Sequence, residues 1–186
     1  MEDEHDQESV DTRTAAAAVV PSACDAKPIY FPVSLTKFVV MNFCTFGMYQ
    51  FYWFYENWKF IREREQSDVS PFWRTAFAFI YCYPLFEKIW SSAASLEIGQ
   101  PFSVPFLATG WILSSLLGVL PDPYAMAAFL SFLFLIPVQQ TANRINESLA
   151  PGHDRNDRLT AWNTVAVVIA ALLFILVVIA IIISRE

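Results

Sequence analysis

The side chains that most often carry chemistry are sparse in this sequence. The three cysteines, Cys24, Cys44 and Cys82, lie too far apart to form a metal-binding or redox motif. The only histidines are His5 and His153, and neither has a second ligand at a metal-binding spacing. We therefore expect neither a metal site nor a cofactor.

One pair of neighbours has the composition of half an acid–base site. His153 is followed directly by Asp154, and an imidazole beside a carboxylate can transfer protons. A hydrated loop pair is the simpler interpretation, because the surrounding residues are polar and typical of a loop. The sequence has no glycine-rich phosphate loop and no nucleophile elbow. We predict that the protein is not an enzyme.

Four charged residues lie within or beside apolar segments and are the candidate site positions. They are Glu56, Arg74, Glu87 and Lys88. A charge inside a bilayer is costly and is then usually functional. Lys88, however, lies within one turn of the end of its segment, where a lysine can extend its ammonium group to the lipid headgroups. We predict that these four are intramembrane polar or interfacial positions, with the interfacial role the simpler one.

The overall composition suggests the setting for these residues. Hydrophobic residues make up 55% of the chain, against ~45–50% in an average domain, and charged residues only 16%, against ~25%. The formal net charge is −6 at pH 7 and comes mostly from the first 26 residues, so the chain lacks the basic surface of a nucleic-acid-binding protein. We expect a membrane protein with no nucleic-acid partner.

The most distinctive stretch covers residues 31–60. An apolar run is interrupted at Thr45-Phe46-Gly47 and resumes as an aromatic run that ends at Tyr55, directly before Glu56. Tyr and Trp combine an apolar body with a polar tip and are most stable where hydrocarbon meets water. We therefore predict that this stretch lies at a membrane surface.

Two paths through Gly47 remain open. With Ser34 as the N-cap, a helix from Leu35 could continue through Gly47 with a kink and cross the membrane. Glycine also permits a reversal, which would give a re-entrant or interfacial hairpin. We favour the kinked crossing, although the distribution of Lys and Arg between the loops mildly favours the hairpin.

The predicted fold is an all-α integral membrane protein, a bundle of four to five transmembrane helices with the first kinked or re-entrant. Pro84 is expected to kink the second segment, and Pro137 to end or bend the fourth before a loop over residues 143–160. Gly110, Ser114, Ser115 and Gly118 offer small faces for close helix packing. The segments are 35–56, 72–90, 102–120, 124–140 and 161–183.

Residues 1–30 are predicted to form an acidic disordered tail, and residues 31–186 the helical membrane domain. The tail has a low-complexity alanine run and too little apolar surface to offset chain entropy. It begins with acidic residues, which a secretory signal does not. We expect the tail to be solvated.

A combination of motifs resembles a known family. Its parts are Thr45-Phe46-Gly47-Met48-Tyr49, Tyr52-Trp53, Ser70-Pro71-Phe72-Trp73-Arg74 and Pro137-Val138-Gln139-Gln140. With them the chain resembles a family of small bacterial multi-spanning inner-membrane proteins of unknown function, which carry a Thr-x-Gly-x-Tyr-x-x-Tyr-Trp signature. The resemblance covers most of the chain from Phe31 onward. It implies a location in the bacterial inner (cytoplasmic) membrane, with several crossings, and no activity.

Two functions follow from these expectations. The first is a non-catalytic scaffold or partner subunit in the membrane, whose partners are the lipid bilayer and either other proteins or a second copy of the chain. The alternative is a small transporter or channel component, in which Glu87, Lys88 and the helix kinks shape a polar path. Because few charges fall inside the apolar segments and no inverted repeat is visible, we favour the scaffold.

Overall fold

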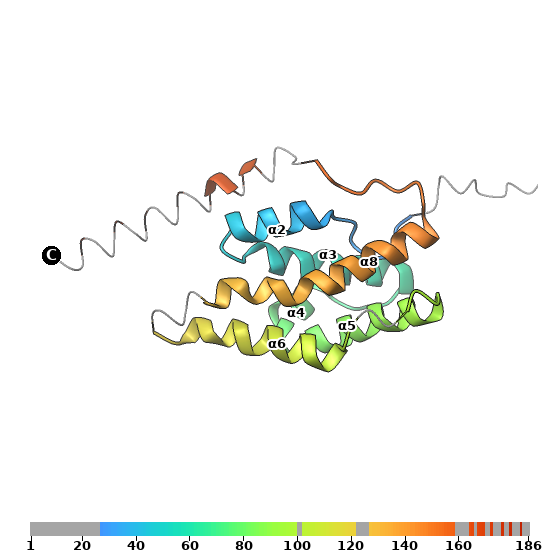
Figure 1. Ribbon diagram of the computed structural model, residues 1–186, viewed down its shortest axis with the longest axis horizontal. Coiled ribbons are helices and arrows are strands. Elements are labelled where there is room, and N and C mark those ends of the chain that lie inside the picture. The colour runs from blue at the N-terminus through green and yellow to red at the C-terminus, as the bar shows by residue number, and fades with distance from the viewer. Residues whose placement is uncertain are drawn as a thin grey trace, which may run out of the picture.

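The computed structural model describes residues 27–99, 102–121 and 127–158, together with isolated positions after residue 163. These residues form α-helices and short 3-10 helices joined by turns (Figure 1). Three predicted features lie wholly or partly outside the described residues: the tail up to residue 26, the start of the segment 124–140 and most of the segment 161–183.

The first two helices form a hairpin. Helix α2 covers Leu35–Cys44 and helix α3 covers Tyr49–Glu65. Ser34 is the N-cap of α2, as predicted, and its hydroxyl accepts a hydrogen bond from the backbone N–H of Lys37. Between the helices the chain reverses, with φ of 51° at Phe46 and 82° at Gly47 (Figure 1), and the ring of Phe31, before α2, lies 5.7 Å from that of Tyr52 in α3. The kinked crossing that the sequence favoured is therefore wrong.

The predicted segment 72–90 is divided into two helices. Helix α4 covers Pro71–Ala76 and helix α5 covers Ala78–Ser95. The break falls at Phe77, whose φ of −102° and ψ of 40° are not helical. Pro84 lies inside α5 without ending it.

The remaining helices form a second hairpin. Helix α6 covers Val104–Leu116 and continues into the 3-10 helix η1, Leu117–Val119; the 3-10 helix η2, Ala128–Leu135, leads into helix α8, Ile136–Leu149. Pro137 lies in the first turn of α8, where a proline lacks no needed donor. The helix therefore continues to Leu149, and the prediction of a loop from residue 143 is wrong.

Small residues allow α6 and η2 to pack closely, as the sequence predicted at Gly110 and Gly118. A Cβ atom at Gly110 would lie 2.3 Å from Cε1 of Phe134, and one at Gly118 would lie 3.3 Å from Cβ of Ala128. Ser114, also predicted to face a neighbouring helix, instead donates a hydrogen bond to the carbonyl oxygen of Gly110. Of the two glycines, Gly110 thus has the less space for a side chain.

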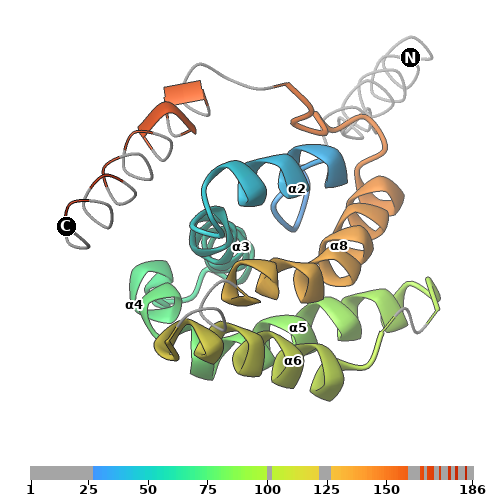
Figure 2. The same ribbon diagram turned by 60° about the vertical axis from the view of Figure 1, so that its left-hand side comes forward.

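The aromatic run in α3 supplies much of the core. Trp53, Phe54 and Trp58 are fully buried, and the Phe54 ring meets that of Trp111 with centroids 4.9 Å apart. In Figure 2, α3 lies between α2 and α4. The run was expected to lie at a membrane surface; instead only part of it, including Tyr52 and Tyr55, is exposed.

The predicted transmembrane bundle is wrong for the described part of the chain. None of its helices combines the length and the apolar character that a membrane crossing requires. Helix α6, for example, has 13 residues and reaches about 20 Å, whereas a hydrocarbon core is about 30 Å thick. The reversal at Gly47 and the break at Phe77 divide the predicted segments 35–56 and 72–90 into shorter helices. The predicted multi-pass location in the inner membrane depended on those crossings and is therefore wrong as well.

Candidate functional site

Four amide side chains hold the chain segment before α2. Asn146 accepts hydrogen bonds from the backbone N–H groups of Ile29 and Tyr30, and it donates one to the carbonyl oxygen of Tyr30 at 2.8 Å. Together the four amides satisfy backbone polar groups of a segment that belongs to no helix or strand. We call them the amide ladder: Asn57, Gln139, Asn143 and Asn146.

Two further buried contacts join glutamines to tryptophans. The indole N–H of Trp53 donates to Oε1 of Gln139, and that of Trp111 donates to Oε1 of Gln50 at 2.7 Å. Ser131 also donates to Gln50. These buried hydrogen bonds join α3 to α8 and α3 to α6.

Of the four predicted site residues, Glu56 lies on α3 beside Lys59. Their carboxylate and ammonium groups are 3.7 Å apart. Burial raises the pKa of Tyr52, and the charge of Glu56 and a hydrogen bond to it raise that pKa further. Glu56 thus interacts with its own helix.

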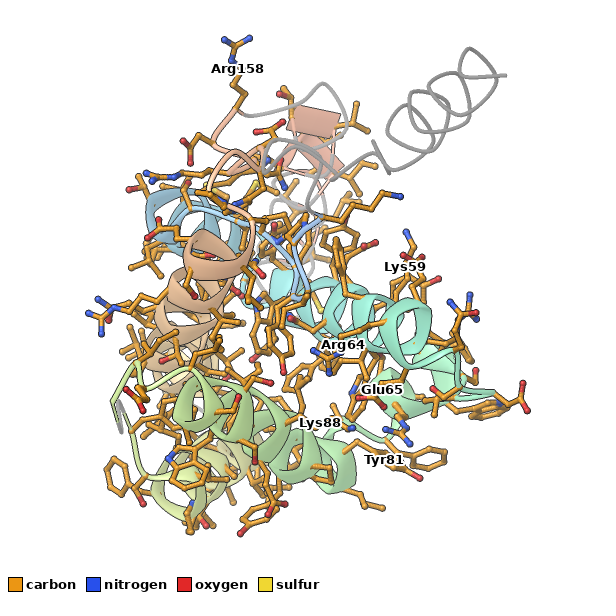
Figure 3. The ribbon with its side chains drawn as sticks, turned by 90° about the vertical axis from the view of Figure 1, so that its right-hand side faces the viewer. Lys59, Arg64, Glu65, Tyr81, Lys88 and Arg158 are labelled. Atoms are coloured by element: carbon orange, nitrogen blue, oxygen red, sulfur yellow. The ribbon has the colours of Figure 1, made fainter. Side chains whose placement is uncertain are left out.

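Lys88 makes an ion pair with the end of α3. Its Nζ lies 2.7 Å from Oε1 of Glu65, and Arg64 reaches the same oxygen at 3.0 Å (Figure 3). The hydrogen bond from Lys88 is the largest influence on Glu65 and holds the pKa of its carboxyl below the usual value. The pair joins α3 to α5.

Arg74 stacks on two rings. Its guanidinium carbon lies 4.2 Å from the centroid of the Trp58 ring and 5.2 Å from that of Tyr81. Such cation–π contacts stabilise a partly desolvated arginine. Arg74 therefore attaches α4 to α3 and α5.

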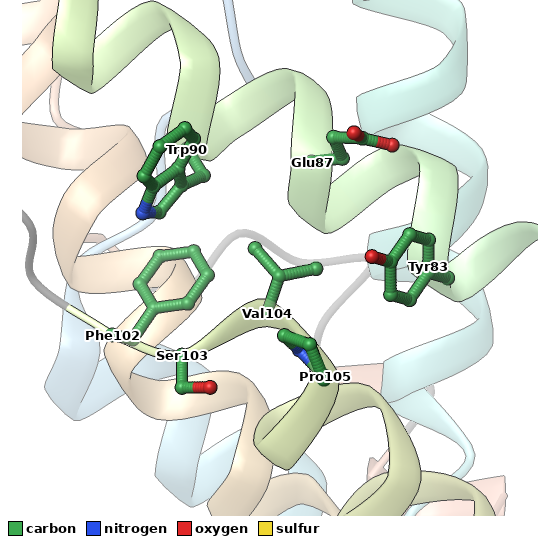
Figure 4. Close-up of a pocket in the computed structure, with 7 residues that line it drawn as sticks. All are labelled: Tyr83, Glu87, Trp90, Phe102, Ser103, Val104 and Pro105. Carbon is green, nitrogen blue, oxygen red and sulfur yellow. The ribbon is translucent and has the colours of Figure 1, made fainter.

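Glu87 faces a cleft between α5 and the start of α6. Figure 4 shows Tyr83, Glu87 and Trp90 on one wall, opposite the residues from Phe102 onward. The four predicted residues thus have separate surroundings. In particular, Glu87 and Lys88, which a polar path would have to share, face different neighbours.

Lys37 is a buried charged residue that was not among the predicted site residues. Its side chain is 4% exposed, and its ammonium group donates to Oδ1 of Asn156 at 2.8 Å and to the carbonyl oxygen of Arg158 at 2.7 Å. Burial lowers its pKa, partly opposed by Asp154 and Asp157. Its position next to the apolar run of α2 gave no indication that a distant loop would cover it.

The histidine and cysteine predictions can be placed as well. Nδ1 of His153 lies 2.7 Å from the carbonyl oxygen of Ala150, while Asp154 accepts from the backbone of Asn156. Cys44 and Cys82 are both free, and burial raises the pKa of Cys82 to about 11. No group of three or more metal-ligating side chains occurs among the residues that the structure describes.

One part of the surface is apolar and lies where the ends of several elements meet. The end of α2, the start of α3, the end of α6 with η1 and the start of η2 gather at one side of the molecule, at the left in Figure 1. The sequence has no charged residue in 38–55, 102–121 or 127–143. We call this region the apolar end; its exposed large side chains are Phe43, Met48, Leu116, Val119, Leu120 and Leu130.

The opposite end is charged. There the last turns of α3, α5 and α8 meet water, and α3 ends in Arg62-Glu63-Arg64-Glu65. Exposed aromatic residues with polar tips precede the first charges: Tyr55 comes directly before Glu56, and Tyr83 is one turn before Glu87. Along α3 the exposed residues therefore change from apolar to aromatic to charged.

Comparisons with protein-family models, with curated proteins and with solved structures found no match to this chain.

Proposed function

We propose that the protein is a non-catalytic scaffold or partner subunit that binds a lipid bilayer through its apolar end. The observation that supports this most is the exposure of large side chains in a region without charge. Phe43 is 73% exposed and Val119 is 83% exposed. Contiguous apolar patches of this kind mark interaction surfaces.

The free energy favours covering this surface. Complete burial of a large apolar side chain stabilises by about 1.5–3 kcal/mol, so a side chain that is already half buried gains about half as much. Several such side chains acting together suffice for binding to an interface. Contact with acyl chains requires no membrane-spanning helix.

The exposed tyrosines that precede Glu56 and Glu87 favour a lipid bilayer over a protein as the partner of the apolar end. A protein interface needs no ordered change from apolar to aromatic to charged residues. A bilayer presents hydrocarbon, headgroups and water in that order, and Tyr and Trp are most stable at the middle level. With the apolar end in lipid, the charged end of α3 faces water, where it can bind a protein partner.

The test is flotation of the full-length protein with neutral phosphatidylcholine vesicles after detergent removal. Val119→Glu places a charge in the apolar end, and we expect it to reduce vesicle binding about tenfold or more. Leu149→Glu is the matched control, because Leu149 is 41% exposed at the end of α8, on the charged side. Circular dichroism checks that both variants fold.

Equal flotation of the two variants would contradict the proposal. So would a wild-type protein that does not float and instead forms a defined oligomer that Val119→Glu dissociates. That result would assign the apolar end to a second copy of the chain.

A further inference from the structure

The cleft beside Glu87 combines one carboxylate with aromatic walls. Tyr83, Glu87 and Trp90 are spaced by four and three residues, which places them on one face of α5. Phe102 and Val104 face them from the start of α6 (Figure 4). The cavity volume is about 580 Å³, within the range of small-molecule sites.

The carboxylate of Glu87 has no ion-pair or hydrogen-bond partner among the described residues. The neighbouring cation, Lys88, is bound to Glu65 instead. The cleft therefore presents a negative charge that nearby residues do not neutralise.

The walls around this charge suit an organic cation. Tyr83 and Trp90 present aromatic rings on the α5 side, and Phe102 adds a third ring from the other wall. The faces of aromatic rings attract cations, and groups of such rings recognise alkylated ammonium groups. A metal ion would need several oxygen or nitrogen ligands, whereas a methylated ammonium gains from contact with rings.

We infer that this cleft binds an organic ammonium group, with Glu87 supplying the charge and Tyr83, Trp90 and Phe102 the aromatic contacts. The group can belong to a free quaternary ammonium compound such as choline or to the headgroup of a choline lipid. The site itself does not depend on the proposed function. Only the binding of a lipid headgroup depends on the proposed function, because the apolar end must then bring the cleft to the headgroups.

The first experiment is equilibrium dialysis of the full-length protein in dodecyl maltoside with radiolabelled choline. We expect saturable binding that Glu87→Gln and Trp90→Leu each weaken about tenfold. Glu97→Gln is the matched control, because Glu97 is an exposed acidic residue after α5 that does not line the cleft. This control should bind as the wild type does.

A neutral ligand of the same shape tests the charge. Competition with 3,3-dimethylbutan-1-ol, in which carbon replaces the choline nitrogen, should be at least about tenfold weaker than competition with unlabelled choline. Equal competition by the two would overturn the inference, as would loss of binding in Glu97→Gln but not in Glu87→Gln.

The two sources are then separated with short-chain phosphatidylcholine below its micelle concentration. Stronger competition by this lipid than by choline assigns the site to a headgroup, and equal competition assigns it to a free quaternary ammonium compound. Val119→Glu should keep choline binding even where it abolishes flotation, so failure of the proposed function is distinguishable from failure of this site. Absence of both choline and lipid binding in the wild type would overturn the inference.

Discussion

Single buried amides determine how the chain enters the fold. The backbone of residues 29–33 belongs to no helix or strand, so its polar groups depend on the amide ladder. Gln139, Asn143 and Asn146 are spaced by four and three residues, which is a helical periodicity present in the sequence. The sequence gives no sign that these amides bind the segment before α2, because a partner more than 100 residues away leaves no local signal.

Replacing Asn146 with leucine tests the ladder. Asn146→Leu leaves two backbone N–H groups and one carbonyl oxygen without their partner, which should lower the free energy of unfolding by about 2–5 kcal/mol. Gln140→Leu, an exposed position on the same helix, should change it by less than about 0.5 kcal/mol. Urea unfolding followed by circular dichroism measures both, and equal values for the two variants would refute the ladder.

The ion pair between Glu65 and Lys88 gives the stability a dependence on pH. Because the folded state lowers the pKa of Glu65, the unfolded state binds more protons, and the stabilisation is present above about pH 4.5 and lost at lower pH. Both side chains are about one-third exposed, so the effect is at most about 1 kcal/mol.

Lys88→Met should therefore lower the free energy of unfolding at pH 6 more than at pH 3. Lys59→Met is the control, because the Lys59–Glu56 contact is longer, at 3.7 Å, and should contribute less. A Lys88→Met variant with the same deficit at both pH values would show that the lysine acts through packing alone.

Some helix boundaries in this chain are marked by a residue type in the sequence, and others are not. Ser34 and Gly47 marked the start of α2 and the turn after it, because a cap and a positive φ both select residue types. The break at Phe77 has no such marker, and its residue type is common inside helices. Pro137 was misleading for a different reason: the same residue ends one helix or begins another, and only the preceding 3-10 helix η2 decides between them.

The tight contact between α6 and η2 can be tested at Gly110. Gly110→Ala should lower the free energy of unfolding by about 1–3 kcal/mol, because its Cβ would overlap the Phe134 ring, despite the better helix propensity of alanine. Gly118→Ala has more space and should cost less.

A double variant identifies the cause. In a Phe134→Ala background, Gly110→Ala should be neutral or stabilising, because the overlap is gone and the propensity gain of up to about 1 kcal/mol remains. If Gly110→Ala lowers the free energy of unfolding by the same amount in that background, the backbone of α6 and not the Phe134 ring causes the loss.

For the whole molecule, composition predicted the apolar character but not its arrangement. Percentages count hydrophobic residues without regard to turns, so a chain with 55% such residues suggested long crossings. In the described residues, turns and breaks shorten the apolar runs, part of the aromatic run is buried in α3, and part of the exposed apolar surface gathers at the apolar end. That separation of an apolar end from a charged end is the basis of the proposed function.

The most direct test of that proposal is the depth of spin labels in phosphatidylcholine vesicles. Single labels at Val119→Cys and Leu149→Cys, with Cys24 and Cys44 replaced by serine and Cys82 by alanine, report on the apolar and charged ends. We predict that the label at 119 is accessible to oxygen and shielded from a water-soluble nickel chelate, and that the label at 149 shows the reverse. Full accessibility of both labels to the chelate would contradict the account.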